Sequence, residues 1–344
     1  MFGTRFEVIA SEMEELNSLD TGTDGFEWIR RVPSPLNLFW GVHWQSGLLS
    51  LPLKRGDILV LSGQPRNISN IVALVFFRLK GVTVLWWGHY WSATSKTLRA
   101  QIRFFLMSLS SGIILYTDKE VEKARKNVLL RKKRITALNN GLESHQIKEL
   151  RENFVLETRV KRGLFIGRLT PKASFDILIK SMTLISDPEF KIHVIGAGHF
   201  EDEIKENARR NGVFDRFIWH GALTNENLIS KIANSCMFFV YPGSVGLSII
   251  HGFMYGLPAI VHDNRTHQMP EFDSAELGFN AEFFEMGSPL SLAEKINEIL
   301  DNPELLKNLS VNALKTVEDE FNIESMKNRF AIFISLFDRN YKNE

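Results

Sequence analysis

The segment between residues 237 and 261 constrains the fold of this chain more than any other. An apolar stretch at 237–241 runs into a loop of Pro, Gly and Ser, and a short run of small and apolar residues then ends at a Gly and a Pro. A second apolar stretch follows at 259–261, so the pattern predicts a strand, a loop, a helix and a second, parallel strand. Such a loop points backbone N–H groups and the positive end of a helix dipole at a place where an anion can bind. The alternative is an ordinary turn between a strand and a helix, without a ligand.

Short apolar stretches alternate with longer amphipathic ones along most of the chain. Strands separated by helices of this length indicate doubly wound parallel sheets, one in each half. With 344 residues, 44% of them hydrophobic, the chain can form two domains that each have a core. The predicted fold is therefore α/β, with two Rossmann-like domains facing each other across a cleft. The predicted strands are 6–10, 57–61, 82–86, 112–116, 163–166, 191–195, 217–220, 237–240 and 259–261, and the predicted helices are 69–79, 97–109, 175–183, 201–211, 225–233, 303–322 and 323–337.

A turn signal at residues 139–143 separates the two halves, and a polar, charged stretch follows it up to about residue 161. We therefore predict an N-terminal domain at 1–150 and a C-terminal domain at 160–322. The segment 323–344 is predicted to form a C-terminal helix that packs back toward the N-terminal domain, since its apolar residues recur at helical spacing.

Composition limits the cellular setting and the partners. The single cysteine, Cys236, excludes an internal disulfide and fits a reducing compartment. The longest apolar region, 68–87, is interrupted by Arg and Lys, and we find neither a signal peptide nor a membrane-spanning segment. Residues 1–160 hold 22 Lys and Arg against 15 Asp and Glu, with the excess concentrated at 119–134. This basic run is either a solvated face or a docking surface for an anionic membrane or lipid-linked phosphate. No nucleic-acid-binding motif accompanies it.

Five short motifs follow one another before the strand-loop-helix segment. They are WGH at 87–89, NGLE at 140–143, GRLTPK at 167–172, VIGAG at 194–198 and IWHG at 218–221. In this order and spacing they resemble the retaining glycosyltransferases of the GT-B fold, the large "group 1" family. The WGH turn resembles one found in a subset that acts on bacterial surface polysaccharides. The resemblance covers about residues 55–337 and implies an acceptor domain followed by a nucleotide-sugar donor domain.

The resemblance implies a set of donor-site residues in the second domain. Arg168 follows a strand at the carboxyl edge of the sheet, where doubly wound folds bind ligands, and is expected to stabilise the charge of the leaving diphosphate. Lys172 is a second candidate cation, although the family's lysine usually stands one position later, where this chain has Ala173. The other residues assigned to donor binding are Gly196, Gly198, Trp219, Gly221, Gly243, Ser244, Val245, Gly246, Leu247, His251 and Glu271.

Two carboxylates that the family usually places eight positions apart are absent. Alignment on the glycines of the segment puts Gly243 at the first position and His251 at the second. The loss indicates either an inactive transferase or a branch with a different donor site. We favour the second, in which Gly243, Ser244 and Val245 bind through backbone N–H groups, His251 through its imidazole and Glu271 from the next loop.

Three residues of the first domain are candidates for the other side of the reaction. His89, after a predicted strand, is expected to contact the donor sugar across the cleft. His43 and Arg66 are assigned to the acceptor side, and structural roles remain open for all three. The strand, Gly-rich loop and helix with which the family begins have no counterpart before residues 6–10, so the acceptor is the least defined partner.

The expected activity is transfer of a sugar from a nucleotide-sugar co-substrate to a glycan or lipid-linked acceptor, with retention and without a metal. No Asp-x-Asp pair is present, and Arg and Lys with a helix N-terminus can replace a cation at the diphosphate. An inverting transferase would need a general base, for which His43, His89 and Glu14 are the candidates. A non-catalytic GT-B partner or glycan-binding protein is a further alternative, and a sugar-nucleotide epimerase a remote one. We expect a cytoplasmic protein, attached peripherally to the inner face of the cell membrane.

Overall fold

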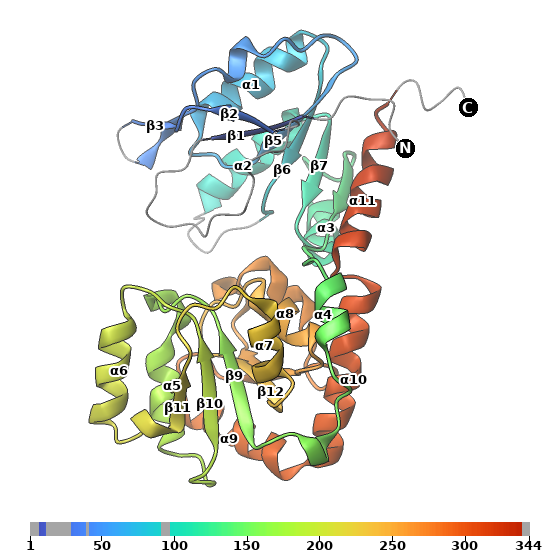
Figure 1. Cartoon of the computed structure of the whole chain (residues 1–344). Helices are drawn as coiled ribbons and strands as arrows, with labels where there is room; N and C mark the ends of the chain where they lie inside the picture. Colours follow the sequence, from blue (N-terminus) through green and yellow to red (C-terminus); the bar gives the residue numbers. More distant parts are fainter. Residues whose placement is uncertain (1–6, 12–28, 39–40, 91–96, 339–344) are drawn as a thin grey trace. The chain divides into compact units, whose positions relative to one another are not determined.

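The computed structural model describes residues 7–11, 29–38, 41–90 and 97–338 and consists of two compact units (Figure 1). The first unit is formed from the described residues of 1–115, 120–136 and 333–344, and the second from 116–119 and 137–332. Among the described helices, none is long and apolar enough to cross a membrane. Each unit is described separately below.

The first unit is built on a four-stranded sheet whose strand order is β5-β6-β7-β8. Strand β5 pairs in parallel with β6, and β6 with β7. Two small ladders accompany this sheet, one parallel (β1 and β2) and one antiparallel (β3 and β4). The elements are β1 (Val8–Ser11), β2 (Ile29–Val32), β3 (Leu36–Asn37), β4 (His43–Trp44), η2 (Leu48–Ser50), β5 (Ile58–Ser62), α1 (Ile68–Leu79), β6 (Thr83–Trp87), α2 (Thr97–Leu109), β7 (Gly112–Leu115), α3 (Asp118–Lys126) and β8 (Arg134–Ala137).

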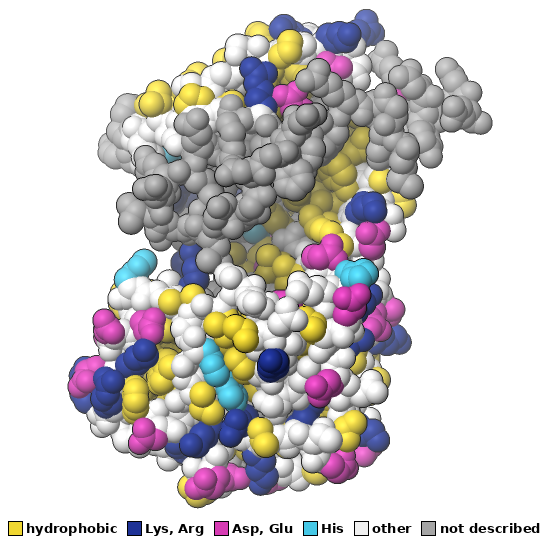
Figure 2. All heavy atoms as spheres, viewed as in Figure 1, with side chains coloured by type: hydrophobic (Ala, Val, Ile, Leu, Met, Phe, Trp, Pro, Cys, Tyr) yellow, Lys and Arg dark blue, Asp and Glu magenta, His cyan; other side chains and the backbone are white. Residues whose placement is uncertain are grey.

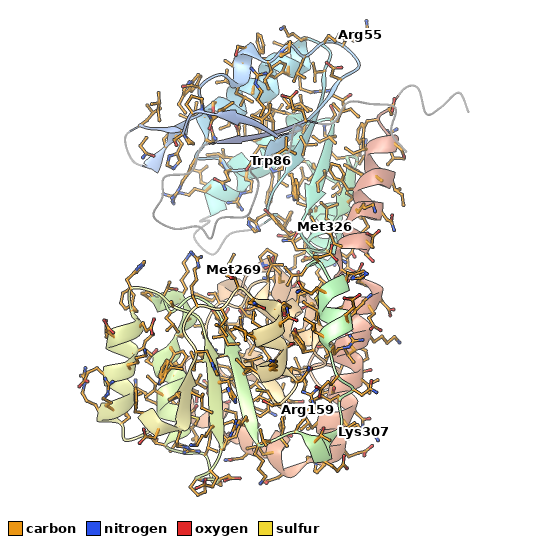
Figure 3. The ribbon with its side chains drawn as sticks, in the orientation of Figure 1. Arg55, Trp86, Arg159, Met269, Lys307 and Met326 are labelled. Carbon is orange, nitrogen blue, oxygen red and sulfur yellow. The ribbon has the colours of Figure 1, made fainter. Side chains whose placement is uncertain are left out.

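Trp86 organises the carboxyl edge of this first sheet (Figure 3). Its indole is almost fully buried, and it lies where any side chain on Gly63 would have to go, because a Cβ there would be 2.2 Å from the indole Nε1. Gly88 is also close, since a Cβ on this residue would lie 3.2 Å from the same atom. The loops that follow β5 and β6 are therefore held together over one aromatic ring.

The second unit is built on a six-stranded sheet of parallel strands in the order β11-β10-β9-β12-β13-β14. Its elements are α4 (His145–Leu150), η3 (Leu156–Thr158), β9 (Arg162–Ile166), η4 (Pro171–Ala173), α5 (Phe175–Met182), β10 (Lys191–Ile195), α6 (Glu201–Arg210), η5 (Phe214–Arg216), β11 (Phe217–Trp219), α7 (Glu226–Ala233), β12 (Phe238–Tyr241), α8 (Ser248–Met254), β13 (Ala259–His262), η6 (Arg265–His267), η7 (Pro270–Ser274), β14 (Ala281–Phe284), α9 (Pro289–Asp301), α10 (Pro303–Asp319) and α11 (Ile323–Ser335).

The strand order of this second sheet reverses between β9 and β12. From β9 the chain winds outward to β10 and β11, then returns to β12 beside β9 and winds outward in the other direction. Helix α5 packs against α6 and α9, and α8 packs against α10. In an open parallel sheet, ligands bind outside the carboxyl ends of the strands at such a switch point. Figure 3 shows Met269 at that end of the second unit and the buried Arg159 at the opposite end.

The predicted α/β class with parallel sheets is confirmed, and every predicted strand that lies in the described residues overlaps an observed one. Of the predicted first strand, Phe6 lies outside the described residues. Strands β2, β3, β4, β8 and β14 and helices α3, α4 and α9 were not predicted. Helix α3 and the start of β8 lie in the basic run at 119–134, whose charges hide the apolar periodicity. Cys236 is fully buried, as expected of a small hydrophobe.

Candidate functional site

Four loops meet at the carboxyl edge of the second unit's sheet and are joined by backbone hydrogen bonds. The Gly196 N–H, after β10, donates to the Gly221 carbonyl, after β11, at 2.7 Å. The Leu169 N–H, after β9, donates to the Ala197 carbonyl at 3.0 Å. On the other side, the Ser244 N–H, after β12, donates to the Lys172 carbonyl at 3.0 Å. The loops after β11, β10, β9 and β12 thus form one continuous edge across the switch point.

Glycines make this close approach of the loops possible. A Cβ on Gly196, whose φ is +150°, would lie 1.9 Å from the Gly167 carbonyl oxygen. A Cβ on Gly198 would lie 2.2 Å from the Leu169 carbonyl oxygen, and one on Gly243 would lie 2.0 Å from that of Lys172. No side chain fits at such distances. Gly196, Gly198 and Gly243 therefore stand where backbone meets backbone, whereas a Cβ on Gly221 or Gly246 would meet no backbone atom.

Two exposed cations lie on this edge. Arg168 follows β9, and Lys172 lies in η4, directly beside the loop that follows β12. Gly167, which precedes Arg168, lies against Tyr241 at the end of β12, since a Cβ on this glycine would be 2.7 Å from a carbon of the Tyr241 ring. The structure thus brings both predicted cations to the switch point, where an anionic ligand would benefit from their charge.

The prediction that Ser244 and Val245 offer free backbone N–H groups is wrong. The Ser244 N–H is bonded to the Lys172 carbonyl, and the Val245 N–H donates to Gln268 Oε1 at 2.7 Å. Within the described part of the chain, the N–H groups of Gly246 and Leu247 have no acceptor. The Gly243 N–H, the third of the predicted group, also has no acceptor there, so an anion could meet the N–H groups of Gly243, Gly246 and Leu247.

His251 is also held differently from the expectation. Its Nε2 lies 2.8 Å from Glu226 Oε1, to which the Tyr255 hydroxyl donates at 2.6 Å. Although burial raises the pKa of Glu226, hydrogen bonding and the charge of His251 bring it below its usual range. Burial raises the pKa of Tyr255, and its bond to Glu226 adds to the rise. The imidazole nitrogen Nε2 therefore faces a protein carboxylate rather than an open site.

Glu271 supplies a buried carboxylate beside the same loop. Its side chain is 6% exposed, and its Oε1 accepts a hydrogen bond from Asn140 Nδ2 at 2.8 Å. Its Oε2 lies 3.9 Å from the position that a Cβ on Gly246 would occupy. The next loop of the sheet thus places a carboxylate next to the free N–H groups, and the Asn140 amide fixes its orientation.

The indole of Trp219 packs into an aromatic cluster instead of lying over the loops. Its ring centroid is 5.5 Å from that of Phe217, 5.7 Å from that of Phe175 and 6.1 Å from that of Phe214. Lys205 Nζ lies 5.5 Å from the ring centroid. Because Trp219 and Phe217 are two residues apart on β11, they share one face of the sheet. The structure therefore gives Trp219 a packing role, and only its backbone runs to the site edge.

The three first-unit candidates lie near the carboxyl edge of the first sheet. Arg66, in the loop after β5, is exposed, and its carbonyl accepts a hydrogen bond from the His43 N–H at 2.9 Å. His43 Nδ1 lies 2.7 Å from Asn37 Oδ1. His89 follows Gly88, whose N–H donates to the Ile114 carbonyl of the neighbouring strand at 3.1 Å. Glu14, the remaining candidate base, lies outside the described residues.

A family model described as Glycosyl transferases group 1 matches residues 146–316, which include every loop of the second-unit site. This region, which holds the second-unit site, belongs to the group 1 glycosyltransferase family. An uncharacterized glycosyltransferase of Methanocaldococcus jannaschii is 29% identical over 156 residues, which make up 44% of this chain and 41% of that protein. The chain spans less than half the length of the curated relatives that it matches.

Solved structures confirm the GT-B fold for this chain. The lipopolysaccharide outer core galactosyltransferase WaaB superposes with a TM-score of 0.61 at 17% identity, covering 81% of this chain and 74% of the other. Anabaena HepE in complex with UDP superposes with a TM-score of 0.63 at 16% identity, covering 81% and 79%. At these identities, the likeness concerns the fold.

The motifs did not reveal three side chains that shape the two edges. Gln268 is 4% exposed and joins two loops, since its amide accepts from Val245 and donates to the His262 carbonyl at 3.0 Å. Glu226 holds His251. Glu120, in α3, is 1% exposed, and its Oε1 accepts the Tyr90 N–H at 3.0 Å, one residue after His89. Gln268 lies 23 residues from Val245, Glu226 lies 25 residues from His251, and Glu120 lies within the basic run, so no local signal marked them.

Two buried histidines of the second unit predict an acid-sensitive fold. Burial lowers the pKa of His193 on β10 and of His262 on β13 to about 4, from about 6.5 in an unfolded chain. Between these values the unfolded chain binds more protons, so both groups stabilise the fold above pH 6.5 and lose that contribution as the pH falls toward 4. We expect the free energy of unfolding, measured with urea, to fall by roughly 2 kcal/mol per histidine from pH 7 to pH 5.

A matched pair of variants tests this pH dependence. His262→Gln is expected to remove its half of the loss between pH 7 and pH 5, whatever it does to stability at pH 7. His145→Gln, at a position whose side chain is 80% exposed, should leave the pH dependence unchanged. Equal pH dependence in His262→Gln and the unaltered protein would contradict the assignment.

Proposed function

We propose that this protein transfers a sugar, with retention, from a nucleoside-diphosphate sugar to a glycan or lipid-linked acceptor in the synthesis of a surface polysaccharide or glycoconjugate. The observation that carries the proposal is the continuous edge of four loops at the switch point, with Arg168 and Lys172 on it. Two solved proteins of the same fold support it, because one is a lipopolysaccharide outer core galactosyltransferase and the other was crystallised with UDP.

The donor diphosphate would bind at the start of α8. The free N–H groups of Gly246 and Leu247 would donate to phosphate oxygens, and Arg168 would neutralise charge that grows as the sugar leaves. Lys172 would contribute a second positive charge from the adjacent loop. The buried Glu271 carboxylate lies where it could accept hydrogen bonds from hydroxyl groups of the nucleotide sugar. These roles need no metal, and we expect transfer to continue in the presence of a chelator.

Retention follows from a front-face reaction. The bond between the anomeric carbon and the leaving phosphate oxygen breaks, and the acceptor oxygen forms its bond to the same carbon from the same face. The acceptor hydroxyl proton moves to the departing phosphate oxygen, so the reaction balances without a nucleophile from the enzyme. The protein's task is then to hold the diphosphate and to stabilise its developing charge, for which the described cations and N–H groups are suited.

The first unit would bind the acceptor and contribute a contact to the donor sugar. His43 and Arg66 lie together at the edge of its sheet, and His89 follows the neighbouring strand. A lipid-linked acceptor would place the protein on the inner face of the cell membrane, in the cytoplasm. The buried carboxylate of Glu120 next to Tyr90 would stabilise the loop that carries His89.

A donor screen tests the proposal. Calorimetric titration with uridine, guanosine, thymidine and adenosine diphosphate sugars is expected to give saturable binding of one nucleotide class, and the product formed with a glycan acceptor should keep the anomeric configuration of the donor, read by NMR. A product of the opposite anomeric configuration would show that the protein is an inverting transferase rather than a retaining one. Absence of binding by every donor would remove the proposal itself.

A non-catalytic GT-B partner is the second candidate, and one observation favours it. Neither of the two positions at which the family has a carboxylate provides one here. Gly243 has no room for a side chain, and His251 is paired with Glu226. Such a protein would bind a glycan or a second transferase and no nucleotide sugar. The same calorimetric screen separates the two candidates, since saturable donor binding is expected of the transferase alone.

A further inference from the structure

We propose that the outer faces of α1 and α2 dock the first unit on a bilayer of anionic phospholipid. The inference deepens the proposed attachment to a membrane and assigns it to residues outside the basic run at 119–134. It is carried by apolar side chains exposed at helical spacing on both helices, and by the sign of the charge on the segment that contains them.

Helix α1 has apolar side chains on two faces. Ala73, Leu74 and Phe77 face the core and are at most 1% exposed. A helix that needed only this contact would carry polar residues on its other side. Instead, a second apolar stripe recurs every three or four residues along α1 and remains exposed: Ile68 (39%), Val72 (38%), Val75 (45%), Phe76 (37%) and Leu79 (85%).

Helix α2 adds a matching stripe. Leu98, Ile102 and Phe105 recur at spacings of four and three residues and are 72%, 50% and 55% exposed. A shallow groove joins the two helices and is lined by Val75 and Leu79 from α1 and Leu109 from α2, among others. The two stripes therefore form one apolar surface, the α1–α2 face. A contiguous apolar surface rimmed by polar groups marks an interaction site.

The segment that contains α1 and α2 carries charges of one sign. Residues 58–117 contain six Lys and Arg and no Asp or Glu. Arg78, Lys80 and Arg99 are exposed on or next to the two helices, and Lys80 Nζ lies 4.8 Å from the Phe76 ring centroid. Figure 2 shows Lys and Arg side chains beside hydrophobic ones, with a few Asp or Glu among them, along the part of the first unit where Figure 1 places α1. Apolar side chains that insert between headgroups, flanked by cations that attract them, are the features of an interfacial membrane helix.

A second copy of the chain fits this face less well. A symmetric dimer would bring the same face of two copies together and would set the cations of α1 and α2 in one copy against those in the other, with no acid on either described helix to pair them. The basic run at 119–134 is also a poorer docking surface, because part of it is used inside the protein. Lys133 Nζ donates to the Ser110 carbonyl at 2.8 Å, and the Arg134 guanidinium donates to the Leu336 carbonyl.

Vesicle flotation with the full chain tests the inference. We expect the protein to float with vesicles of 70% zwitterionic and 30% anionic phospholipid, and to remain unbound when the anionic lipid is replaced. The double variant Leu79→Glu/Leu98→Glu should lower partitioning on the order of a hundredfold, since two apolar contacts are lost and two repelled charges are added. Both positions are at least 72% exposed, so folding should be unaffected.

A control variant carries the same chemical change elsewhere. Leu290→Glu/Val311→Glu places two acids at exposed helical positions of the second unit (57% and 59%) and should float like the unaltered protein. Equal flotation of both double variants, or no preference of the unaltered protein for anionic vesicles, would overturn the inference. So would sedimentation showing a dimer that only Leu79→Glu/Leu98→Glu dissociates. Calorimetric titration of the same proteins with the nucleotide-sugar donor tests the proposed function separately, because neither double variant alters a donor-site residue.

Discussion

Arg168→Ala is expected to abolish sugar transfer while the protein remains folded. The side chain is exposed at the end of β9, and the preceding Gly167 lies against Tyr241 at the end of β12, so Arg168 lies at the switch point without contributing to the core. Loss of one neutral hydrogen-bond donor to a developing negative charge costs about 10²- to 10³-fold in turnover. We expect a larger loss here, about 10³- to 10⁴-fold, because a charged group stabilises an anion more strongly than a neutral donor.

Three measurements separate this role from a structural one. The thermal midpoint of Arg168→Ala should lie within about 2 °C of the unaltered protein, since substitutions at exposed positions change stability little. Arg168→Lys should recover part of the activity, because the charge returns without the bidentate geometry. Arg210→Ala, on the exposed face of α6, is the matched control and should retain full turnover. Normal turnover in Arg168→Ala would remove the assigned role.

The sequence predicted which loops meet but not the contacts between their residues. Strand positions were readable, because buried parallel strands are short apolar runs, and the glycines at 196, 198 and 243 stood out next to them. That Gly243 is required by the Lys172 carbonyl is a contact between segments about 70 residues apart, and only the fold brings them together. The same holds for Gln268, whose side-chain oxygen accepts the hydrogen bond from the Val245 N–H.

The partner of the His251 imidazole escaped the sequence for the same reason. From the sequence, His251 follows a glycine-rich loop and stands where the related enzymes have a carboxylate. The structure shows that Glu226, from the preceding helix, lies 2.8 Å from its Nε2. A local pattern places a residue on an element, whereas the partner of a polar side chain depends on the packing of distant elements.

Restoring the family's glutamate by Gly243→Glu is expected to destabilise the second unit and to abolish donor binding. The missing carboxylate suggests that adding it would improve the enzyme, but the backbone leaves no room for one. A Cβ on Gly243 would lie 2.0 Å from the Lys172 carbonyl oxygen and 2.6 Å from the Ala173 carbonyl carbon, both backbone atoms that cannot rotate away. The loop after β12 would have to separate from η4 and break the bond from the Ser244 N–H to Lys172.

Overpacking of this kind costs roughly 3 kcal/mol, which lowers the thermal midpoint of a unit of this size by about 6–12 °C. Gly246→Ala, three residues further along the same loop, is the matched control. Its added Cβ would lie 3.8 Å from the nearest atoms of Met269, an ordinary contact, so its midpoint should shift by about 2 °C at most. Scanning calorimetry measures both shifts, and titration with the donor measures the binding that separation of the two loops removes. A Gly243→Glu protein of unchanged midpoint and stronger donor binding would show that this loop opens freely, and that the glycine is a lost carboxylate rather than a requirement of the packed site.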